Sequence, residues 1–232
     1  MTTKEKLLAL LEDSKGTFFS GEEIARTLQV SRAAVWKAVN ALREDGYTID
    51  AVTNKGYRLS PDSDILSPQG IRRFLKPEYR DLNLTVLPTV PSTNALVREK
   101  ANQGCPEGCV IIACEQTAGR GRYGRQFFSP ADTGVYLSLL LRPTAYSPQQ
   151  ATCLTAAAAA AMCQAIEAVT GQHPGIKWVN DIFLHGKKVC GILTEAAVGL
   201  ETGTLNYMVL GAGINVYPPT DGFPEEIQSI AG

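Results

Sequence analysis

Residues 20–44, "SGEEIARTLQVSRAAVWKAVNALRE", decide the fold of the N-terminal part of the chain. Ser20 stands three residues before Glu23, which is the spacing of a capping box and predicts that a helix begins here. A short turn at Gln29–Val30 leads to Ser31, a good N-cap residue for a further helix. In that helix, apolar residues recur at helical spacing on one face: Val35, Val39 and Leu42.

The segments on either side extend this pattern. Residues 4–13, "KEKLLALLED", predict a leucine-rich helix before it, and residues 46–60, "GYTIDAVTNKGYRLS", predict a hairpin after it. Helix, helix, turn, helix and hairpin, in that order, is the arrangement of a winged helix-turn-helix. We predict this domain over residues 1–62, because the proline- and serine-rich "SPDSDILSP" at 60–68 indicates a boundary.

The third predicted helix carries the charge pattern of a DNA-reading helix. Residues 31–43 contain three cations and no acid, and Lys55 and Arg58 add positive charge on the predicted wing. A helix-turn-helix lays its second helix in the major groove, which predicts DNA contacts from four outward residues: Arg32, Trp36, Lys37 and Asn40. A protein-binding module is the alternative, because winged helices also serve that purpose and one basic helix face is common.

The remainder, residues 63–232, has the pattern of a mixed sheet. Strand candidates lie at 83–90, 109–116, 134–141, 188–196 and 205–216, and helix candidates at 68–76, 93–102 and 148–169. The strands outnumber the helices and come in adjacent pairs without an obligatory helix between them. We therefore predict an α+β domain on a mixed sheet rather than a doubly wound fold.

Composition points to a soluble, cytoplasmic protein without a membrane partner. The net charge of −1 and the pI near 6.2 argue against a chain that coats nucleic acid uniformly, although a local basic face is compatible with them. We find no signal-peptide pattern and expect no apolar run long enough to span a bilayer. The six cysteines show no C-x-x-C spacing, which favours buried reduced thiols over a zinc site.

Residues 117–129, "TAGRGRYGRQFFS", predict an anion-binding loop. Its glycines supply backbone that can adopt positive φ and approach a ligand closely, and its arginines supply fork-shaped donors for phosphate or carboxylate. These six residues alternate within the loop: Gly119, Arg120, Gly121, Arg122, Gly124 and Arg125. The pattern fits a polyphosphate, although it matches neither the Walker nor the dinucleotide fingerprint. RGG-like RNA binding or disorder is the alternative, which the position of the loop between two strands disfavours.

Two further stretches place polar residues at element ends. "KWVND" sets Lys177, Asn180 and Asp181 before a strand, and Lys188 begins the next one. A lysine near an arginine-rich loop can neutralise charge developing on an adenylyl group, and Asp181 is a candidate ligand of Mg²⁺. An ordinary turn is the alternative for Asn180-Asp181. The triplet at 92–94, "STN", opens a helix and can hydrogen-bond a compact polar group, although helix capping is its default role.

Several motifs together resemble those of the bifunctional biotin protein ligases that double as biotin operon repressors. They are "STN", "EQTAGRGRYGRQFFSP", "GVYLSLLLRP", "KWVND", "GKKVCGILTE" and "GAGINV", in this order and spacing. The resemblance covers nearly the whole chain and implies a catalytic domain similar to class II aminoacyl-tRNA synthetases. It implies that biotin, ATP and Mg²⁺ give biotinyl-5′-adenylate, and that biotin passes to a lysine of a biotin carboxyl carrier protein. Operator DNA and a ligand-promoted homodimer are the further partners it implies.

The resemblance also implies roles for individual residues. Biotin contacts fall on eight positions: Ser92, Thr93, Asn94, Gln116, Arg120, Gly121, Arg122 and Lys188. Contacts to the adenylate and ATP fall on Arg122, Arg125, Lys177, Asn180 and Asn215. The expected catalytic residues among them are Lys177, Arg122 and Arg125, and Lys177 is the first candidate for stabilising the reaction.

The sequence departs from the family pattern at several points. Tyr123 stands where the family usually has arginine, Phe127 where it has tryptophan and Val179 where it has proline. The sequence stops at "FPEEIQSIAG", so we expect the catalytic domain 63–232 to be incomplete and a C-terminal SH3-like domain to be absent through truncation. Two alternatives stay open. One is a biotin-sensing transcription factor without ligase activity, and the other is a lipoate ligase, whose His-containing signature we do not find.

Overall fold

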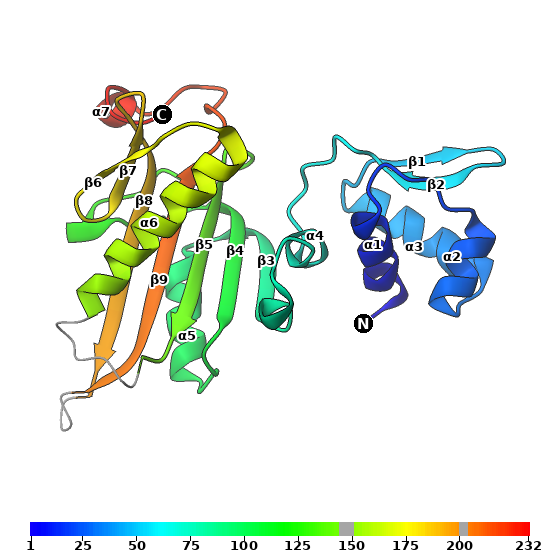
Figure 1. The fold of residues 1–232 in the computed structure, drawn as a ribbon, viewed down its shortest axis with the longest axis horizontal. Coiled ribbons are helices and arrows are strands. Elements are labelled where there is room, and N and C mark those ends of the chain that lie inside the picture. The colour runs from blue at the N-terminus through cyan, green and yellow to red at the C-terminus, as the bar shows by residue number, and fades with distance from the viewer. Residues whose placement is uncertain (144–150, 200–203) are drawn as a thin grey trace. The chain divides into compact units, whose positions relative to one another are not determined.

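Figure 1 shows the computed structural model of the chain, which describes residues 1–143, 151–199 and 204–232. The chain folds into two compact units, Met1–Asp81 and Leu82–Gly232. Each unit has its own apolar core, so each is described by itself.

Unit 1 has the predicted order of helices and hairpin. Its elements are α1 (Thr3–Asp13), α2 (Gly21–Leu28), α3 (Arg32–Glu44), β1 (Ile49–Val52), β2 (Gly56–Leu59), α4 (Pro68–Arg72) and the 3₁₀ turn η1 (Pro77–Tyr79). Strands β1 and β2 pair antiparallel, and Phe19 forms a bridge to Tyr57 beside them. The winged helix-turn-helix is thus formed as predicted.

The serines that begin α2 and α3 act as N-caps. The Ser20 hydroxyl accepts a hydrogen bond from the Glu23 N–H at 3.0 Å, and the Ser31 hydroxyl accepts from the Ala34 N–H at 3.2 Å. The reciprocal capping box is formed elsewhere, by Thr2 and Glu5 at the start of α1. The caps fix where each helix starts and therefore which face of α3 turns inward.

One face of each helix of the winged domain builds a single core. The predicted α3 residues Val35, Val39 and Leu42 are buried. Ala38 of α3 joins them, and the rest of the core comes from outside this helix: Leu7, Leu8, Leu11, Ile24, Tyr47, Ile49 and Leu59. Because the apolar face of α3 is used in this core, its basic face lies at the surface.

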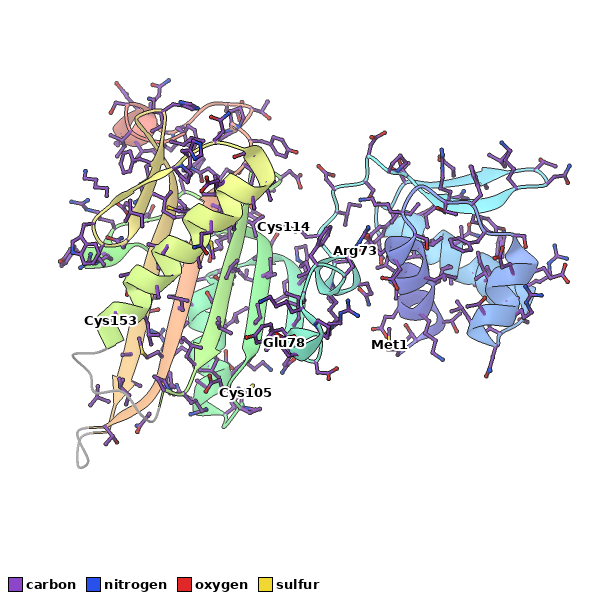
Figure 2. All side chains as sticks on the ribbon, in the orientation of Figure 1. Met1, Arg73, Glu78, Cys105, Cys114 and Cys153 are labelled. Atoms are coloured by element: carbon purple, nitrogen blue, oxygen red, sulfur yellow. The ribbon has the colours of Figure 1, made fainter. Side chains whose placement is uncertain are left out.

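By packing, the two compact units divide at Asp81–Leu82, further along the chain than the predicted end of the winged domain at residue 62. Helix α4 belongs to unit 1 because it packs on α1 and buries its N-cap residue, Ser67. Glu12 of α1 is also buried, and it faces Arg73, labelled in Figure 2, at 3.8 Å. Burial raises the pKa of the Glu12 carboxyl. The serines and prolines at 60–68 therefore precede a docked helix, not a free linker.

Unit 2 is built on a seven-stranded mixed sheet. Its elements are β3 (Asn83–Val90), α5 (Thr93–Asn102), β4 (Cys109–Gln116), the 3₁₀ turn η2 (Arg122–Gly124), β5 (Gly134–Leu141), α6 (Ala151–Thr170), β6 (Gly175–Lys177), β7 (Asp181–Leu184), β8 (Lys187–Val198), β9 (Leu205–Asn215) and α7 (Glu225–Gln228). The strand order is β3-β4-β5-β9-β8-β7-β6. Among the strand pairs in the described part of this sheet, β3–β4 alone is parallel, and α5 is the crossover that this pair requires.

Helices α5 and α6 cover opposite faces of this sheet (Figure 1). On the α5 face, Val97 and Ala101 pack with Ile111, Leu140 and Val209. The core on the α6 face contains Ala158, Ala159, Ile182, Cys190, Ile192 and Ala212. From Cys190 to Glu195 in β8 and from Met208 to Ile214 in β9, odd-numbered residues face α5 and even-numbered residues face α6. A register shift before Cys190 turns Lys188 to the α5 face as well.

Strand β6 is missing from the sequence prediction, whereas β7 is the strand predicted to follow "KWVND", although it begins at Asp181 itself. Strand β6 has three residues, which is too few to show a period. The turn between them spans residues 178–180. Asn180 thus lies in a turn, as its alternative interpretation held, whereas Asp181 begins β7.

Helix α6 corrects the expectation that no segment is long enough to span a bilayer. By length and composition its segment Cys153–Thr170, with a mean hydropathy of 1.4, could cross a membrane. A single helix of this kind is weak evidence, since core helices share these properties, and α6 places Ala158 and Ala159 against the sheet. Residues 148–150 of the predicted helix lie outside the described residues.

All six cysteines are free thiols. Cys109 and Cys190 are buried, whereas Cys153 is exposed, so the prediction of buried thiols holds only for some of them. Cys105, Cys114 and Cys153 lie well apart in Figure 2. Burial raises the pKa of the Cys190 thiol to about 12. Among the residues that the structure describes, no group of three or more His, Cys, Asp and Glu side chains could hold a metal ion.

Gly56 provides a test of the winged domain. Its φ is +97°, and a Cβ atom there would lie 2.0 Å from the carbonyl oxygen of Phe19. We expect Gly56→Ala to lower the free energy of unfolding of unit 1 by about 2–4 kcal/mol, from a positive φ and a backbone clash together. Gly46→Ala is the matched control, because Gly46 has a φ of +94° but its nearest neighbour is 3.6 Å away. Chemical denaturation of both variants measures the difference, and equal losses would contradict the role of the Phe19 contact.

Candidate functional site

A narrow pocket of about 50 Å³ opens on the α5 face of the sheet, at the start of α5. Its walls come from the β4 end, the glycine–arginine loop and the odd-numbered side of β8 and β9. All eight residues expected to contact biotin line it: Ser92, Thr93, Asn94, Gln116, Arg120, Gly121, Arg122 and Lys188. The fold thus brings together residues that lie up to about a hundred positions apart in the sequence.

The first turn of α5 forms the floor of the pocket. Ser92 has the extended backbone of an N-cap residue, yet its hydroxyl makes no capping hydrogen bond. Gln116 of β4 supplies the cap instead, because its Oε1 accepts from the Thr93 N–H at 2.9 Å. The default capping role of the "STN" triplet is therefore taken by a side chain from another element, and Ser92 remains a pocket-lining hydroxyl, 3% exposed.

Asn94 ties α5 to the sheet. Its Nδ2 donates to Glu195 Oε2 at 2.8 Å and to the Leu193 carbonyl at 3.3 Å. Its Oδ1 lies 2.6 Å from the Ser138 hydroxyl. A Cβ atom on Gly211 would fall 2.0 Å from this Oδ1, so only glycine in β9 leaves room for the amide.

Phe127 closes one side of the pocket. Its ring lies against two strand glycines, since a Cβ on Gly213 would be 2.4 Å from Cε1 and one on Gly191 would be 3.0 Å from Cε2. It also meets the Tyr136 ring edge-on, with centroids 6.4 Å apart. Burial raises the pKa of the Tyr136 phenol, which stays a neutral donor to the Pro130 carbonyl at 3.1 Å. The aromatic wall is thereby fixed against the sheet.

The glycine–arginine loop, residues 117–129, folds back on itself as a narrow backbone hairpin. The Phe127 N–H donates to the Gly119 carbonyl at 2.9 Å, and the Gly121 N–H donates to the Arg125 carbonyl at 2.7 Å. The two arms of this hairpin approach so closely that position 119 requires glycine, because a Cβ there would lie 2.3 Å from the Phe127 carbonyl oxygen.

Positive φ occurs in this loop at only some of the expected places. Gly124 has a φ of +73°, but the residue before it, Tyr123, is also left-handed at +57°. Gly121 is extended, with φ −116°, and Gly119 also has no positive φ. Of the three glycines, Gly124 is therefore the one that uses positive φ.

A row of charged and amide groups separates the pocket from a larger cavity. Arg122 Nη1 donates to Asn180 Oδ1 at 3.0 Å, and Asn180 Nδ2 donates to Asp181 Oδ1 at 2.9 Å. The same Asp181 oxygen forms an ion pair with Lys188 Nζ at 2.7 Å. Two cations are thus held at the junction of the two spaces by one carboxylate and one amide.

The larger cavity has a volume of about 680 Å³ and shares this junction. Arg122, Arg125, Asn180 and Asn215, four of the residues expected to contact an adenylate, line it. Aromatic and apolar side chains complete it: Tyr123, Phe127, Phe128, Phe223, Pro224, Ile227 and Ile230. Together the two spaces offer a small hydrogen-bonding compartment and a large aromatic one, with cations between them.

Lys177 does not line either space. Its ammonium lies over the Phe183 ring, 5.4 Å from the centroid, and the side chain is exposed. It pairs in register with Asp181 across β6 and β7, so both residues project from the same face of the sheet. The Lys177 side chain therefore leaves the backbone on the face of the sheet that carries the junction, but its ammonium group lies outside both spaces.

Asp181 is the one carboxylate at the junction that fits a magnesium ion. Mg²⁺ retains several waters and commonly takes only one or two protein carboxylates beside phosphate oxygens. Asp181 Oδ1 already serves Lys188 and Asn180. An ion there would therefore draw most of its ligands from phosphates and water.

Unit 1 presents the four residues expected to contact DNA on one side of α3. Arg32 and Lys37 are exposed, Trp36 is 58% exposed and Asn40 is half-buried. Two other cations of the unit are engaged internally. Arg43 donates to the Ile49 carbonyl at 2.6 Å, and Arg58 pairs with Asp50 at 2.6 Å.

Sequence reasoning missed the residues that hold the pocket from behind: Ser129, Ser138, Glu195, Gly211 and Gly213. The strand glycines in "GAGINV" gave a usable signal, because glycine inside a strand often marks close approach of another group. Ser138 and Glu195 gave none, because a serine or glutamate in an alternating strand is ordinary.

Comparison with known proteins gives a consistent result for both units. The sequence profile of the biotin/lipoate A/B protein ligase family matches residues 86–215, and that of an HTH domain matches residues 3–58. The chain is 42% identical to the bifunctional ligase/repressor BirA of Bacillus spizizenii, over 99% of this chain and 70% of that protein. It is 35% identical to BirA of Escherichia coli, over 93% of this chain and 64% of that protein.

A solved structure agrees with these relatives. The biotin protein ligase from Aquifex aeolicus, in complex with biotin and ATP, superposes with a TM-score of 0.51 at 32% identity. The match covers 65% of this chain and 58% of that one. This chain therefore spans about seven tenths of the Bacillus protein and less than two thirds of the Escherichia and Aquifex proteins.

The aromatic wall can be tested at Gly213. We expect Gly213→Ala to push the Phe127 ring off the sheet and to lower the free energy of unfolding by about 1–3 kcal/mol, as overpacking does. Gly175→Ala on the edge strand β6 is the control, since a Cβ there meets nothing within 4 Å. Thermal unfolding compares the two variants, and an unchanged Tm for Gly213→Ala would show that the ring is not held where we place it.

Proposed function

The chain belongs to the biotin/lipoate A/B protein ligase family, and from this premise we propose that it is an ATP-dependent biotin protein ligase and a biotin-responsive transcriptional repressor. The observation that carries the ligase half is the pair of spaces joined by Arg122, Asn180, Asp181 and Lys188. The small compartment takes the ring system of biotin, and the large one takes ATP. The reacting carboxylate and α-phosphate then meet at the cations between them.

The first step forms biotinyl-5′-adenylate. An oxygen of the biotin carboxylate attacks the α-phosphorus of ATP, and the bond to pyrophosphate breaks. Two anions must approach, so the step needs positive charge fixed at the junction. Lys188 and Arg122 supply it, held by Asp181 and Asn180. Arg125 and Lys177 add charge on the side of the large cavity, and their exposed side chains can fold over the bound nucleotide. Asp181 would meet a Mg²⁺ ion bound to the phosphates, and such an ion would supply further positive charge.

The second step consumes the adenylate. The amine of a lysine on a biotin carboxyl carrier protein, part of a biotin-dependent carboxylase, attacks the acyl carbon, and AMP leaves with the bonding electrons. The mixed anhydride must be shielded from water until then. The glycine–arginine loop lies over the junction and is the element suited to shield it, with Phe127 already closing the inner wall.

The repressor half rests on unit 1. Its exposed basic face on α3 suits the major groove of operator DNA, with Arg32, Trp36, Lys37 and Asn40 as the contacts. A homodimer promoted by the adenylate would bind two operator half-sites and couple ligand to DNA. DNA and ATP are both intracellular, which supports a cytoplasmic location. A biotin sensor without ligase activity is the second candidate, favoured by Tyr123, where the family usually has a cation.

Biotin-dependent exchange of labelled pyrophosphate into ATP separates the two candidates. A ligase catalyses the exchange because adenylate formation is reversible. Biotin binding without any exchange would exclude the ligase and support the sensor. Absence of biotin binding would contradict both candidate functions.

We expect Lys177→Ala to lower the rate of this exchange by about 10²–10³-fold, the typical cost of one charge that stabilises a transition state. Biotin affinity should stay within about twofold, since Lys177 does not line the small pocket. Lys100→Ala, at an exposed lysine of α5, is the control. An exchange rate in Lys177→Ala equal to that of the unmodified chain would show that Lys177 takes no part in the reaction.

We expect Lys37→Ala to reduce the salt dependence of DNA binding. Loss of one phosphate contact lowers the slope of log K against log[NaCl] by about one. Fluorescence anisotropy with a mixed-sequence duplex over a NaCl series measures this slope. Lys6→Ala on α1 is the matched control, and equal slopes in the two variants would exclude α3 as the DNA-contacting face.

A further inference from the structure

Tyr123 lies at the tip of the glycine–arginine loop in a backbone conformation that tyrosine rarely adopts. Its φ is +57° and its ψ is 35°, and Gly124 after it has a φ of +73°. The Arg125 N–H donates to the Arg122 carbonyl at 3.2 Å, which closes a turn with the positive φ values of type I′. Asparagine is favoured at the first central position of such a turn, whereas a bulky side chain there is strained. The strain suggests that the Tyr123 side chain has a function.

The Tyr123 side chain folds back onto its neighbour Arg122. The guanidinium carbon of Arg122 lies 5.1 Å from the centre of the Tyr123 ring, and its Nη2 donates to the Tyr123 hydroxyl at 3.2 Å. Tyr123 is 87% exposed, so burial of apolar surface does not explain where its ring lies. The contacts with Arg122 therefore set the direction of the ring.

Arg122 is also held by the turn between β6 and β7. Its Nη1 donates to Asn180 Oδ1 at 3.0 Å. Asn180 is fixed in turn, because its Nδ2 donates to Asp181 Oδ1 at 2.9 Å and to the Ile192 carbonyl at 3.2 Å. The guanidinium is thus fastened to the loop tip and to the sheet. A guanidinium has five N–H groups and these two bonds use two of them, so Arg122 can still donate to an anion at the junction.

Fastening the guanidinium matters because Arg122 is exposed. A long side chain that is free in solution loses rotamer freedom when it binds an anion, and this loss lowers the affinity. Contacts already made in the ligand-free protein remove part of that loss in advance. Tyr123 adds no charge of its own, but it lines the large cavity and could also contact a nucleotide directly. The experiment below separates these two roles.

We propose that Tyr123 is a positioning residue that fixes the Arg122 guanidinium at the junction before an anionic ligand arrives. This proposal rests on the proposed function, in which Arg122 faces the phosphate of biotinyl-5′-adenylate. The ring of Tyr123 stacks on the cation and its hydroxyl accepts one N–H, so an uncharged residue at position 123 strengthens the charge that precedes it.

The test measures, by calorimetry, the affinity of the full chain for biotinol-5′-AMP, a non-reactive analogue in which a phosphodiester replaces the mixed anhydride. Tyr123→Asn should weaken binding about tenfold, because it removes the ring and the hydroxyl from Arg122. Asparagine suits the turn better than tyrosine does, so this variant should be at least as stable as the unmodified chain in thermal unfolding. Tyr123→Phe keeps the ring and removes the hydroxyl, and it should weaken binding about threefold.

Tyr207→Phe is the matched control. The Tyr207 hydroxyl donates to Asn102 Oδ1 at 2.9 Å, and its ring centre lies 5.9 Å from the Arg142 guanidinium carbon. This tyrosine thus makes the same two kinds of contact, but near the start of β9, whereas Asn215 at the end of β9 lines the large cavity. The affinity of Tyr207→Phe for the analogue should equal that of the unmodified chain.

The variant Arg122→Ala shows through which group Tyr123 acts. Once the guanidinium is gone, Tyr123→Asn has nothing left to disorient, so adding it to Arg122→Ala should change the affinity by less than about twofold. Positions 122 and 123 are both exposed, so the single and double variants of this cycle should fold.

The outcomes are distinct. A tenfold loss that persists in the Arg122→Ala background would show that Tyr123 contacts the ligand itself, and it would overturn the proposal. Full affinity in Tyr123→Asn would overturn it as well. Absence of analogue binding by the unmodified chain would instead contradict the proposed function, and with it the ligand assigned to Arg122. Because binding is measured without catalysis, the two failures are told apart.

Discussion

The site depends on one contact, the insertion of the Asn94 amide between α5 and the sheet. The amide bonds β8 on one side and the Ser138 hydroxyl of β5 on the other, and it fits only because β9 has glycine at position 211. With Asn94 fixed, the first turn of α5 cannot slide, and Ser92 and Thr93 are held at the pocket floor. A helix start is thereby placed as rigidly as a strand, which is what recognition of a small polar ring requires.

The junction between the two compartments is held by charged groups rather than by the neutral hydrogen bonds that fix Asn94. There the groups are charged and partly exposed, and they hold one another in the absence of a ligand: Arg122, Asn180, Asp181 and Lys188. Fixed cations of this kind need little reorganisation when an anion arrives. The floor offers neutral hydrogen-bonding groups, whereas the junction offers charge. Under the proposed function, the two compartments divide recognition and reactivity between them.

Much of this architecture could be predicted from the sequence, because its signals are local. Caps at Ser20 and Ser31 and helical periodicity in α3 gave the winged helix, and the motifs gave the eight residues of the small pocket. The failures have physical causes. Strand β6 is too short to show a period, and the burial of Ser67, in the predicted boundary segment, depends on the packing of α4 on α1. Ser138 and Glu195 acquire their role only where β5, β8 and α5 meet, which no local pattern records.

The cap of α5 has a consequence for the order of folding. Most helices carry their own N-cap, so their first turn can form before the rest of the protein. In α5 the cap is the Gln116 side chain, which arrives only when β4 has paired beside β3. The first turn of α5 therefore gains its stabilising bond late, through a contact 23 residues away. In a partly folded chain, this pocket-lining helix start should be the frayed end of α5 until the parallel strand pair closes.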